Sequence, residues 1–151
     1  MAIKKIGIAS DHAGYDYRLE IKKMLADEGY EVADFGIKEK KPVSSWKLVE
    51  DLAYAVLDNT VERGILICGT GIAVSIAANK VKGIRAALCN DLYTAQKSRE
   101  HNDSNVLAFG SRVIGLEVAK EIVRIWLRTE YEGGRHIERN KYIDYIENKN
   151  L

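Results

Sequence analysis

Short apolar segments alternate with longer amphipathic segments along the whole chain of 151 residues. The central one, residues 64–68, is uninterrupted by polar side chains, as is typical of a strand buried on both faces. The segments that we predict as strands are residues 3–9, 30–35, 64–68, 84–88 and 105–109. Because a helical segment follows each, the pattern predicts an α/β fold, a three-layer αβα sandwich of the Rossmann or flavodoxin type. Its five-stranded parallel sheet would be doubly wound.

The intervening segments carry apolar residues at helical spacing. The predicted helices are residues 15–28, 46–59, 72–79, 91–100 and 115–127. Gly29 ends the first of these helices, and Ser44 or Ser45 is predicted to cap the second. Residues 131–151 contain Gly133-Gly134 and then a last helical stretch. No linker divides the chain, so we expect a single domain over residues 1–151 with a C-terminal helical tail from residue 130.

Charge and cysteine usage exclude several classes of protein. Lys plus Arg is 23 and Asp plus Glu is 22, a net charge of +1, which favours neither nucleic acid nor a membrane surface as a partner. The longest uncharged run, residues 64–79, is shorter than the roughly 20 residues that span a bilayer. We recognise no secretion signal at the start and expect a cytoplasmic protein. The two cysteines form no metal-ligand spacing with the three histidines, so no metal site is predicted.

Polar and glycine residues follow the predicted strands. In a parallel α/β sheet, ligands bind beyond the carboxyl ends of the strands. The residues at these ends are 10–12, 36, 68–71, 90–91 and 110–112. Their composition predicts a small-molecule site at this edge of the sheet.

The sequence Cys68-Gly69-Thr70-Gly71 lies between a buried strand and a helix. Its glycines allow a sharp turn and a close approach to a ligand. The unpaired N–H groups and positive dipole of the helix start stabilise a thiolate or another anion. Cys68 is therefore a candidate base or nucleophile, and an inert buried cysteine beside a tight turn is the alternative.

Three other loop motifs do not fit these residues. A dinucleotide fingerprint requires a third glycine where the chain has Val74. A phosphate-binding P-loop ends in Gly-Lys-Ser or Gly-Lys-Thr, but the first lysine after the loop is Lys80. A cysteine phosphatase holds phosphate with an arginine close downstream, and none occurs before Arg85.

Arginine is concentrated in the second half of the chain, which has seven of the nine. The planar guanidinium group suits phosphate and carboxylate. Arg135 and Arg139 are four residues apart and would share one helix face as a phosphate clamp, although a solvated surface is the alternative.

His12 and His101 are predicted to lie at opposite edges of the sheet. His12 follows the first strand beside Asp11 and could bind phosphate or orient a hydroxyl, or the pair could be a helix cap and a solvated side chain. His101 ends the fourth helix, so within one subunit it should lie far from Cys68. Either His101 is a favourable charge at a helix C-terminus, or a second subunit brings it to the thiol.

Together these residues resemble one known family. The segments that carry the resemblance are Ser-Asp-His at 10–12, Ile-Cys-Gly-Thr-Gly-Ile at 67–72, Ser-Ile-Ala-Ala-Asn-Lys at 75–80, Gly-Ile-Arg-Ala at 83–86, Ser-Arg-Glu-His-Asn-Asp at 98–103, Asn-Val-Leu-Ala-Phe-Gly-Ser-Arg-Val-Ile-Gly at 105–115 and Glu-Gly-Gly-Arg-His at 132–136. They cover nearly the whole length and resemble the ribose-5-phosphate isomerase B family, which includes allose-6-phosphate and galactose-6-phosphate isomerases.

The resemblance implies interconversion of an aldose phosphate and a ketose phosphate through an enediolate, without metal or cofactor. It favours ribose 5-phosphate as the substrate. By resemblance, Cys68 moves the proton between C1 and C2, and His101 opens the furanose ring. The enediolate oxygens would be stabilised by the Thr70 hydroxyl and by the backbone of Gly69, Gly71, Ile72 and Ala73. Asp11 and Asn102 would bind sugar hydroxyls, and the phosphate would be held by His12, Arg112, Arg135 and Arg139.

The resemblance also implies a homodimer, or a tetramer, whose sites take residues from two subunits. Two positions differ from the family pattern. Ser45 stands where a tyrosine usually lines the sugar site, and Ala73 stands where the loop usually has a further glycine. Both positions lie on the side of the site that binds the sugar, so the substrate could be a tetrose, pentose or hexose phosphate. The alternative function is a non-catalytic module that binds a phosphosugar.

Overall fold

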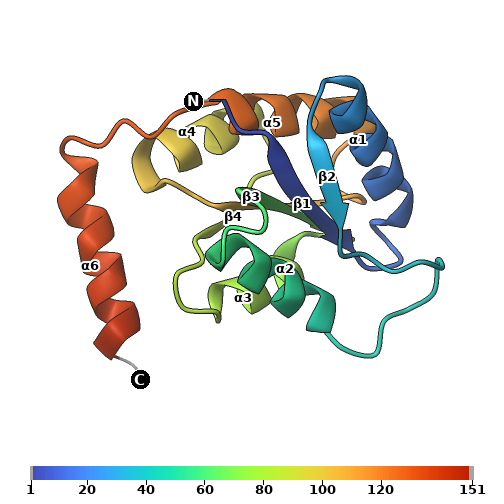
Figure 1. Ribbon diagram of the computed structural model, residues 1–151, viewed down its shortest axis with the longest axis horizontal. Coiled ribbons are helices and arrows are strands. Elements are labelled where there is room, and N and C mark those ends of the chain that lie inside the picture. Colours follow the sequence, from blue (N-terminus) through green and yellow to red (C-terminus); the bar gives the residue numbers. More distant parts are fainter. Residues whose placement is uncertain (1, 150–151) are drawn as a thin grey trace.

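The computed structural model describes residues 2–149. Within them, strands and helices alternate as far as the last strand, and two helices follow it (Figure 1). The elements are β1 (Lys5–Ser10), α1 (Tyr15–Asp27), β2 (Glu31–Asp34), α2 (Lys47–Leu57), β3 (Arg63–Cys68), α3 (Ile72–Asn79), β4 (Ala86–Leu88), α4 (Leu92–Asn102), β5 (Val106–Gly110), α5 (Leu116–Arg128) and α6 (His136–Lys149). All strand pairs are parallel, in the order β2-β1-β3-β5-β4. The predicted α/β fold with a five-stranded parallel sheet is confirmed.

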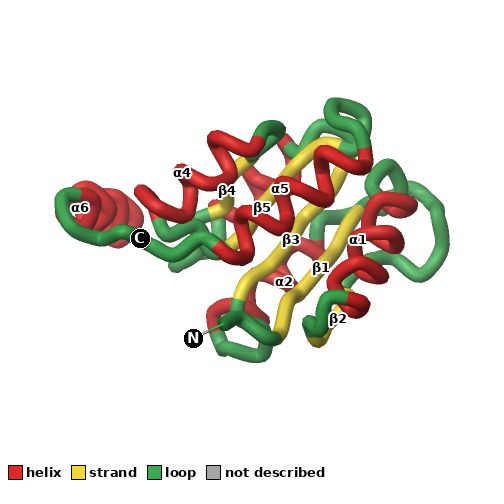
Figure 2. Tube along the Cα trace, turned by 90° about the horizontal axis from the view of Figure 1, so that it is seen from above, coloured by secondary structure: helices red, strands yellow, loops and turns green. Residues whose placement is uncertain are grey.

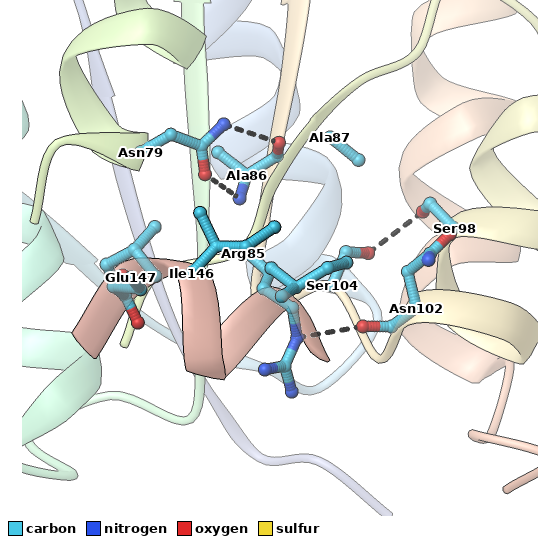
Figure 3. A pocket seen from close by; sticks show the side chains of 11 residues that line it. Asn79, Arg85, Ala86, Ala87, Ser98, Asn102, Ser104, Ile146 and Glu147 are labelled. Atoms are coloured by element: carbon cyan, nitrogen blue, oxygen red, sulfur yellow. Dashed lines mark hydrogen bonds between the residues drawn. The ribbon is translucent and has the colours of Figure 1, made fainter. Parts of the chain in front are cut away.

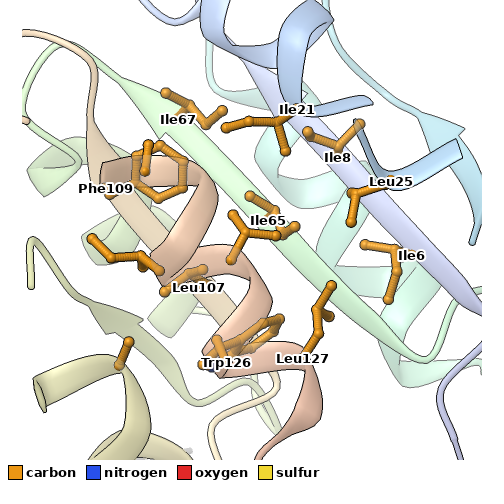
Figure 4. Close-up of a cluster of buried hydrophobic side chains, with 14 of the residues drawn as sticks. Ile6, Ile8, Ile21, Leu25, Ile65, Ile67, Leu107, Phe109, Trp126 and Leu127 are labelled. Atoms are coloured by element: carbon orange, nitrogen blue, oxygen red, sulfur yellow. The ribbon is translucent and has the colours of Figure 1, made fainter. Parts of the chain in front are cut away.

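Helices cover both faces of the sheet, because side chains alternate between the faces along each buried strand. On one face Ile65, Ile67 and their neighbours pack against α1, α4 and α5, and the fully buried Trp126 lies beside Leu127 in this cluster (Figure 4). On the other face Leu66 and Cys68 pack against α2 and α3. Every residue of β3 is buried, as the continuous apolar run predicts.

The strand order reverses at β1: β2 is added on one side of it and β3 on the other. The carboxyl ends of β1 and β3 are therefore neighbours, and the loops that follow them diverge. Ser10 is in register with Ile67, and the Asp11 N–H donates to the Ile67 carbonyl at 3.3 Å. Such a switch point is where ligands bind in this class of fold.

The predicted cap of the second helix is wrong. Trp46 occupies the N-cap position, without a capping side chain, and the Ser45 hydroxyl accepts only a long 3.4 Å hydrogen bond from the Lys47 N–H. The reason is that the first helical N–H groups bond the Trp46 carbonyl, one residue beyond the serines, at 2.9 Å from Val49 and 3.2 Å from Glu50.

The other bounds differ from the prediction by one or two residues. The fourth strand begins at Ala86, because the Ile84 N–H closes a turn onto the Val81 carbonyl and the Ala86 N–H is taken by the Asn79 side chain.

The C-terminal helix α6 lies beside the β4 side of the sheet, set apart from the layered body (Figures 1 and 2). Side chains attach it. Arg85 pairs with Asp144 at 3.2 Å, and Glu147 accepts the Gly83 N–H at 3.0 Å. Residues 150 and 151 of the predicted tail, like residue 1 of the predicted domain, lie outside the described residues.

A cavity of about 470 Å³ separates α6 from β4 and α4 (Figure 3). Ile143 and Ile146 line it and are 45% and 47% exposed, so the helix leaves apolar surface uncovered within one chain. Among residues 2–149 we find no helix that combines the length and the apolar character needed to cross a bilayer.

Candidate active site

The Cys68 thiol lies at the carboxyl end of β3, where only 4% of the residue is exposed. The Gly71 N–H donates to the Cys68 Sγ at 3.1 Å, and α3 begins at the next residue. Gly71 has φ of +80°, and a Cβ there would lie 2.7 Å from the Phe109 backbone. Both the left-handed conformation and the lack of space therefore require glycine. This geometry aims an N–H donor and a helix start at the sulfur, which favours negative charge on it.

The end of β5 holds this loop in place from the side. The Ser111 N–H donates to the Cys68 carbonyl at 2.9 Å, and the Arg112 N–H donates to the Gly69 carbonyl at 3.0 Å. The Arg112 side chain lies over Gly69, 3.4 Å from where a Cβ would be. The Thr70 hydroxyl accepts the Ile72 N–H at 3.2 Å and can still donate its own hydrogen to a ligand.

Asp11 and His12 adjoin this loop from the end of β1. The Asp11 carboxylate accepts the Gly14 N–H at 3.1 Å, but Gly14 itself occupies the N-cap position of α1 and that helix has no capping side chain, so Asp11 is not the helix cap. Asp11 is 8% exposed. The His12 Nδ1 is buried and has no hydrogen-bond partner among the described residues. A buried ring nitrogen without a partner is costly, which suits a position that a ligand completes.

His101 lies at the opposite edge of the sheet, as predicted. Gly64 at the start of β3 is in register with Val106 at the start of β5, and α4 ends just before β5. Cys68 is four residues further along β3, about 13 Å at the rise of a strand. One chain therefore does not bring His101 or Asn102 to the thiol.

His101 has a different set of neighbours. Its ring stacks on that of His136, with centroids 4.2 Å apart and planes at 17°. Burial lowers the pKa of His136, and the charges of His101, Arg135 and Arg139 lower it further, whereas Glu132 opposes them. Sequence reasoning missed Glu132 and His136, whose one signal was their place in the Glu-Gly-Gly-Arg-His segment.

Arg135 and Arg139 lie close to this histidine pair. Arg135 is in the turn before α6, so the predicted common helix face holds only for Arg139, which is in the first helical turn. Both side chains, and that of Arg112, are exposed, and none of the three forms an ion pair with another residue in 2–149. By contrast, Arg85, Arg99 and Arg124 all pair with carboxylates.

The predicted site residues thus fall into two groups within one chain. We call the first the thiol region; it comprises Asp11, His12, Cys68, Gly69, Thr70, Gly71, Ile72, Ala73 and Arg112. We call the second the histidine region; its predicted residues are His101, Asn102, Arg135 and Arg139, and the structure adds two neighbours that were not predicted, Glu132 and His136.

Of the two positions that differ from the family pattern, Ala73 belongs to the thiol region and Ser45 lies in the loop between β2 and α2. Ser45 is exposed at the end of the loop that precedes α2, beside a cavity of about 500 Å³ that this loop lines. Ala73 is half-buried in the first turn of α3. The buried Arg18 anchors the loop, because its guanidinium donates to the Ser10 hydroxyl at 2.9 Å and to the Ile37 carbonyl. Sequence reasoning did not single out Arg18.

Comparison with known proteins identifies the family of the chain. The family model described as Ribose/Galactose Isomerase matches residues 6–143. The chain is 50% identical to ribose-5-phosphate isomerase B of Escherichia coli, covering 97% of this chain and 99% of that protein. It is 43% identical to D-erythrulose-4-phosphate isomerase of Pectobacterium atrosepticum, covering 95% of each.

Solved structures give the same result. The ribose-5-phosphate isomerase B of Clostridium thermocellum superimposes with a TM-score of 0.95 at 51% identity, over 97% of this chain and 99% of that one. The fold and the relatives together define an aldose–ketose isomerase, which is an intramolecular oxidoreductase. Within that class, the chain belongs to the ribose/galactose isomerase family.

Proposed function

We propose that this isomerase interconverts ribose 5-phosphate and ribulose 5-phosphate through an enediolate, with Cys68 as the base. The observation that carries the proposal is the position of the thiol, at the switch point of the sheet with the Gly71 N–H 3.1 Å from its sulfur. The names of the relatives in Escherichia coli and Clostridium thermocellum support the choice of a pentose phosphate.

The proposed chemistry is a proton transfer between adjacent carbons. The Cys68 thiolate removes the proton from C2 of the open-chain aldose, the C1–O1 carbonyl electrons move onto O1, and an enediolate forms. The O2 hydroxyl proton is then transferred to O1 as the C2–O2 carbonyl forms, and the Cys68 thiol returns its proton to C1, which gives the ketose and regenerates the thiolate. The Thr70 hydroxyl and the N–H groups of residues 69–73 stabilise the oxygens where negative charge develops. Asp11 and Asn102 bind sugar hydroxyls.

His101 opens the furanose ring before this step. Its imidazole removes the proton of the O1 hydroxyl and delivers a proton to the ring oxygen, a general acid–base role that suits a histidine. The phosphate is held by His12, Arg112, Arg135 and Arg139. Support for this assignment comes from the exposure of three arginines without carboxylate partners in the described chain.

The proposed site is shared between two copies of the chain. Since the thiol region and the histidine region lie at opposite edges of one sheet, a homodimer is the smallest assembly that joins them, and a tetramer of two dimers meets the same need. Residues 130–151 would pack on the partner. The exposed Ile137, Ile143 and Ile146 of α6, at 42% to 47%, support this packing.

We place the protein in the cytoplasm, acting on a small molecule and not on nucleic acid or membrane. The net charge of +1 supports this assignment. The two cysteines, both buried and unpaired, also fit a reducing compartment.

A substrate screen tests the proposal. Tetrose 4-phosphates, pentose 5-phosphates and hexose 6-phosphates are offered in a coupled isomerase assay, and recovered aldose is analysed for solvent deuterium at C2. We expect the highest kcat/KM with ribose 5-phosphate, together with deuterium incorporation. A higher kcat/KM for another chain length would overturn the choice of sugar. Saturable binding without deuterium incorporation would show a binding module instead of an enzyme.

A further inference from the structure

Three side chains of the histidine region form a cluster that the proposed isomerisation uses only in part. Donor atoms of His101, Glu132 and His136 all lie within 4.8 Å of one another. Two imidazoles and one carboxylate are a common zinc ligand set, with metal–ligand bonds of about 2.0–2.2 Å. Ligand atoms of one tetrahedral ion are about 3.4 Å apart at those bond lengths, so these three donors must move closer by about 1 Å, with one of the stacked rings turned toward the shared cation.

The backbone that carries the cluster is already fixed. The Glu132 N–H donates to the Glu100 carbonyl at 3.0 Å, which ties the segment before α6 to α4. The Asn140 side chain donates to the His101 carbonyl at 2.8 Å, and the His136 N–H closes a turn onto the Gly133 carbonyl at 3.0 Å. The two imidazoles are stacked with nearly parallel planes, so at least one ring must rotate about its side-chain bonds to bind an ion, while the backbone stays in place. The exposed Glu132 gives solvent ions access.

We propose that His101, Glu132 and His136 bind a divalent transition-metal cation of the zinc type, and that its binding inhibits the isomerase. Imidazole nitrogens favour zinc over magnesium or calcium, which prefer oxygen ligands. Three protein ligands leave a fourth position for water. The nearby positive charges of Arg135 and Arg139 oppose a cation, so the site is reversible and not permanently occupied.

Inhibition rests on the proposed role of His101. A nitrogen that binds the metal has no lone pair with which to accept the O1 proton, so a zinc-bound His101 does not open the ring. The site thus couples the concentration of a transition metal to turnover of the sugar phosphate. Neither the spacing of the histidines nor that of the cysteines predicts such a cluster, because it is built from His101 of α4, Glu132 of the segment before α6, and His136, the first residue of α6.

Calorimetric titration with ZnCl₂ and inhibition of ribose 5-phosphate turnover by ZnCl₂ test the proposal together. Glu132→Gln is the key variant, because Glu132 has no part in the proposed isomerisation. We expect basal activity to be unchanged, and zinc binding and inhibition to weaken by at least about 10- to 100-fold, because loss of a direct ligand should cost no less than loss of an outer-shell partner. Glu138→Gln is the matched control: it removes an exposed carboxylate of α6 and should leave both measurements unchanged.

The remaining outcomes separate this site from the thiol and from the proposed function. Cys68→Ala should still bind zinc, and loss of binding there would place the ion on the thiolate and overturn the proposal. Equal zinc inhibition of Glu132→Gln and the unaltered chain would overturn it as well. Zinc binding that depends on Glu132 but leaves turnover unaffected would overturn the inhibition. Zinc binding that depends on Glu132 in a chain without isomerase activity would support the metal site and count against the proposed function.

Discussion

The thiol region and the histidine region of this chain are constructed in different ways. Main-chain hydrogen bonds between the ends of neighbouring strands and close backbone contacts at Gly71 and Gly110 hold the thiol region. The histidine region consists of the end of α4, the segment leading into α6 and the first turn of α6, joined by side chains such as Asn140. One region is thus a direct product of the sheet, whereas the other depends on how a peripheral helix is attached.

The difference explains why one chain can be fully folded and still hold only half of the proposed site. Parallel strands bring their carboxyl ends together, which fixes Asp11, Cys68 and Arg112 as neighbours. The same topology sends the end of α4 to the other edge. The proposed sharing between subunits follows from the fold, and the predictions below test it.

The largest effect is expected at the thiol itself. Cys68→Ala should reduce kcat/KM for ribose 5-phosphate by at least about 10³-fold, because the transfer between C1 and C2 loses its base. The matched control is Cys89→Ala. Burial raises the pKa of the Cys89 thiol, which lies in the core on the other face of the sheet and should be dispensable for turnover. Near-normal activity of Cys68→Ala in the coupled assay would remove the thiol from the mechanism.

A smaller effect, which depends on the substrate, is expected in the histidine region. His101→Asn should slow ribose 5-phosphate turnover by about 10²-fold through loss of ring opening. A tetrose 4-phosphate cannot close a furanose ring, because its O4 carries the phosphate. Any activity on erythrose 4-phosphate should therefore survive the substitution. The ratio of the two rates measures the role of His101, and an equal loss on both substrates would assign it to another step.

Mixing the two variants tests whether the regions meet across subunits. In a mixed dimer of Cys68→Ala and His101→Asn chains, one site combines the two intact residues and the other combines the two substituted ones. Random mixing should therefore restore about a quarter of the unmixed wild-type activity. The assay follows activity after co-refolding, with each variant refolded alone as the control. No recovery in mixed dimers confirmed by mass spectrometry would argue against a shared site.

The smallest effect concerns stability on the helix layer behind the histidine region. The Ser104 hydroxyl accepts the Trp126 Nε1–H at 2.8 Å and lies 2.8 Å from the Ser98 hydroxyl, all three buried. Ser104→Ala leaves the indole N–H without a partner and should lower the free energy of unfolding by about 1–3 kcal/mol, measured by urea denaturation. Ser44→Ala, at an exposed loop position, is the control and should change it by less than about 0.5 kcal/mol. Turnover should be unchanged in both.

The sequence could predict those features that are determined by residues close together in the chain. The strands and helices follow from short hydrophobic patterns, and the thiol loop follows from four consecutive residues, so these features could be predicted from the sequence. The order of strands in the sheet comes from long-range packing, which periodicity does not encode. The cap at Ser44 or Ser45 was wrong because the start of α2 is set by Trp46 and the preceding loop. The contact between His101 and His136 was missed because it depends on the direction in which the chain leaves α5.

The two outer strands of the sheet have a consequence for behaviour at high protein concentration. The edge strand β2 has four residues and carries the exposed Glu31 and Asp34, and the other edge strand, β4, has three residues. Edge strands this short, one of them charged, are poor templates for the addition of further strands, the route by which sheets polymerise and aggregate. Copies of this chain are therefore expected to meet through helices, in closed assemblies and not in open-ended fibres.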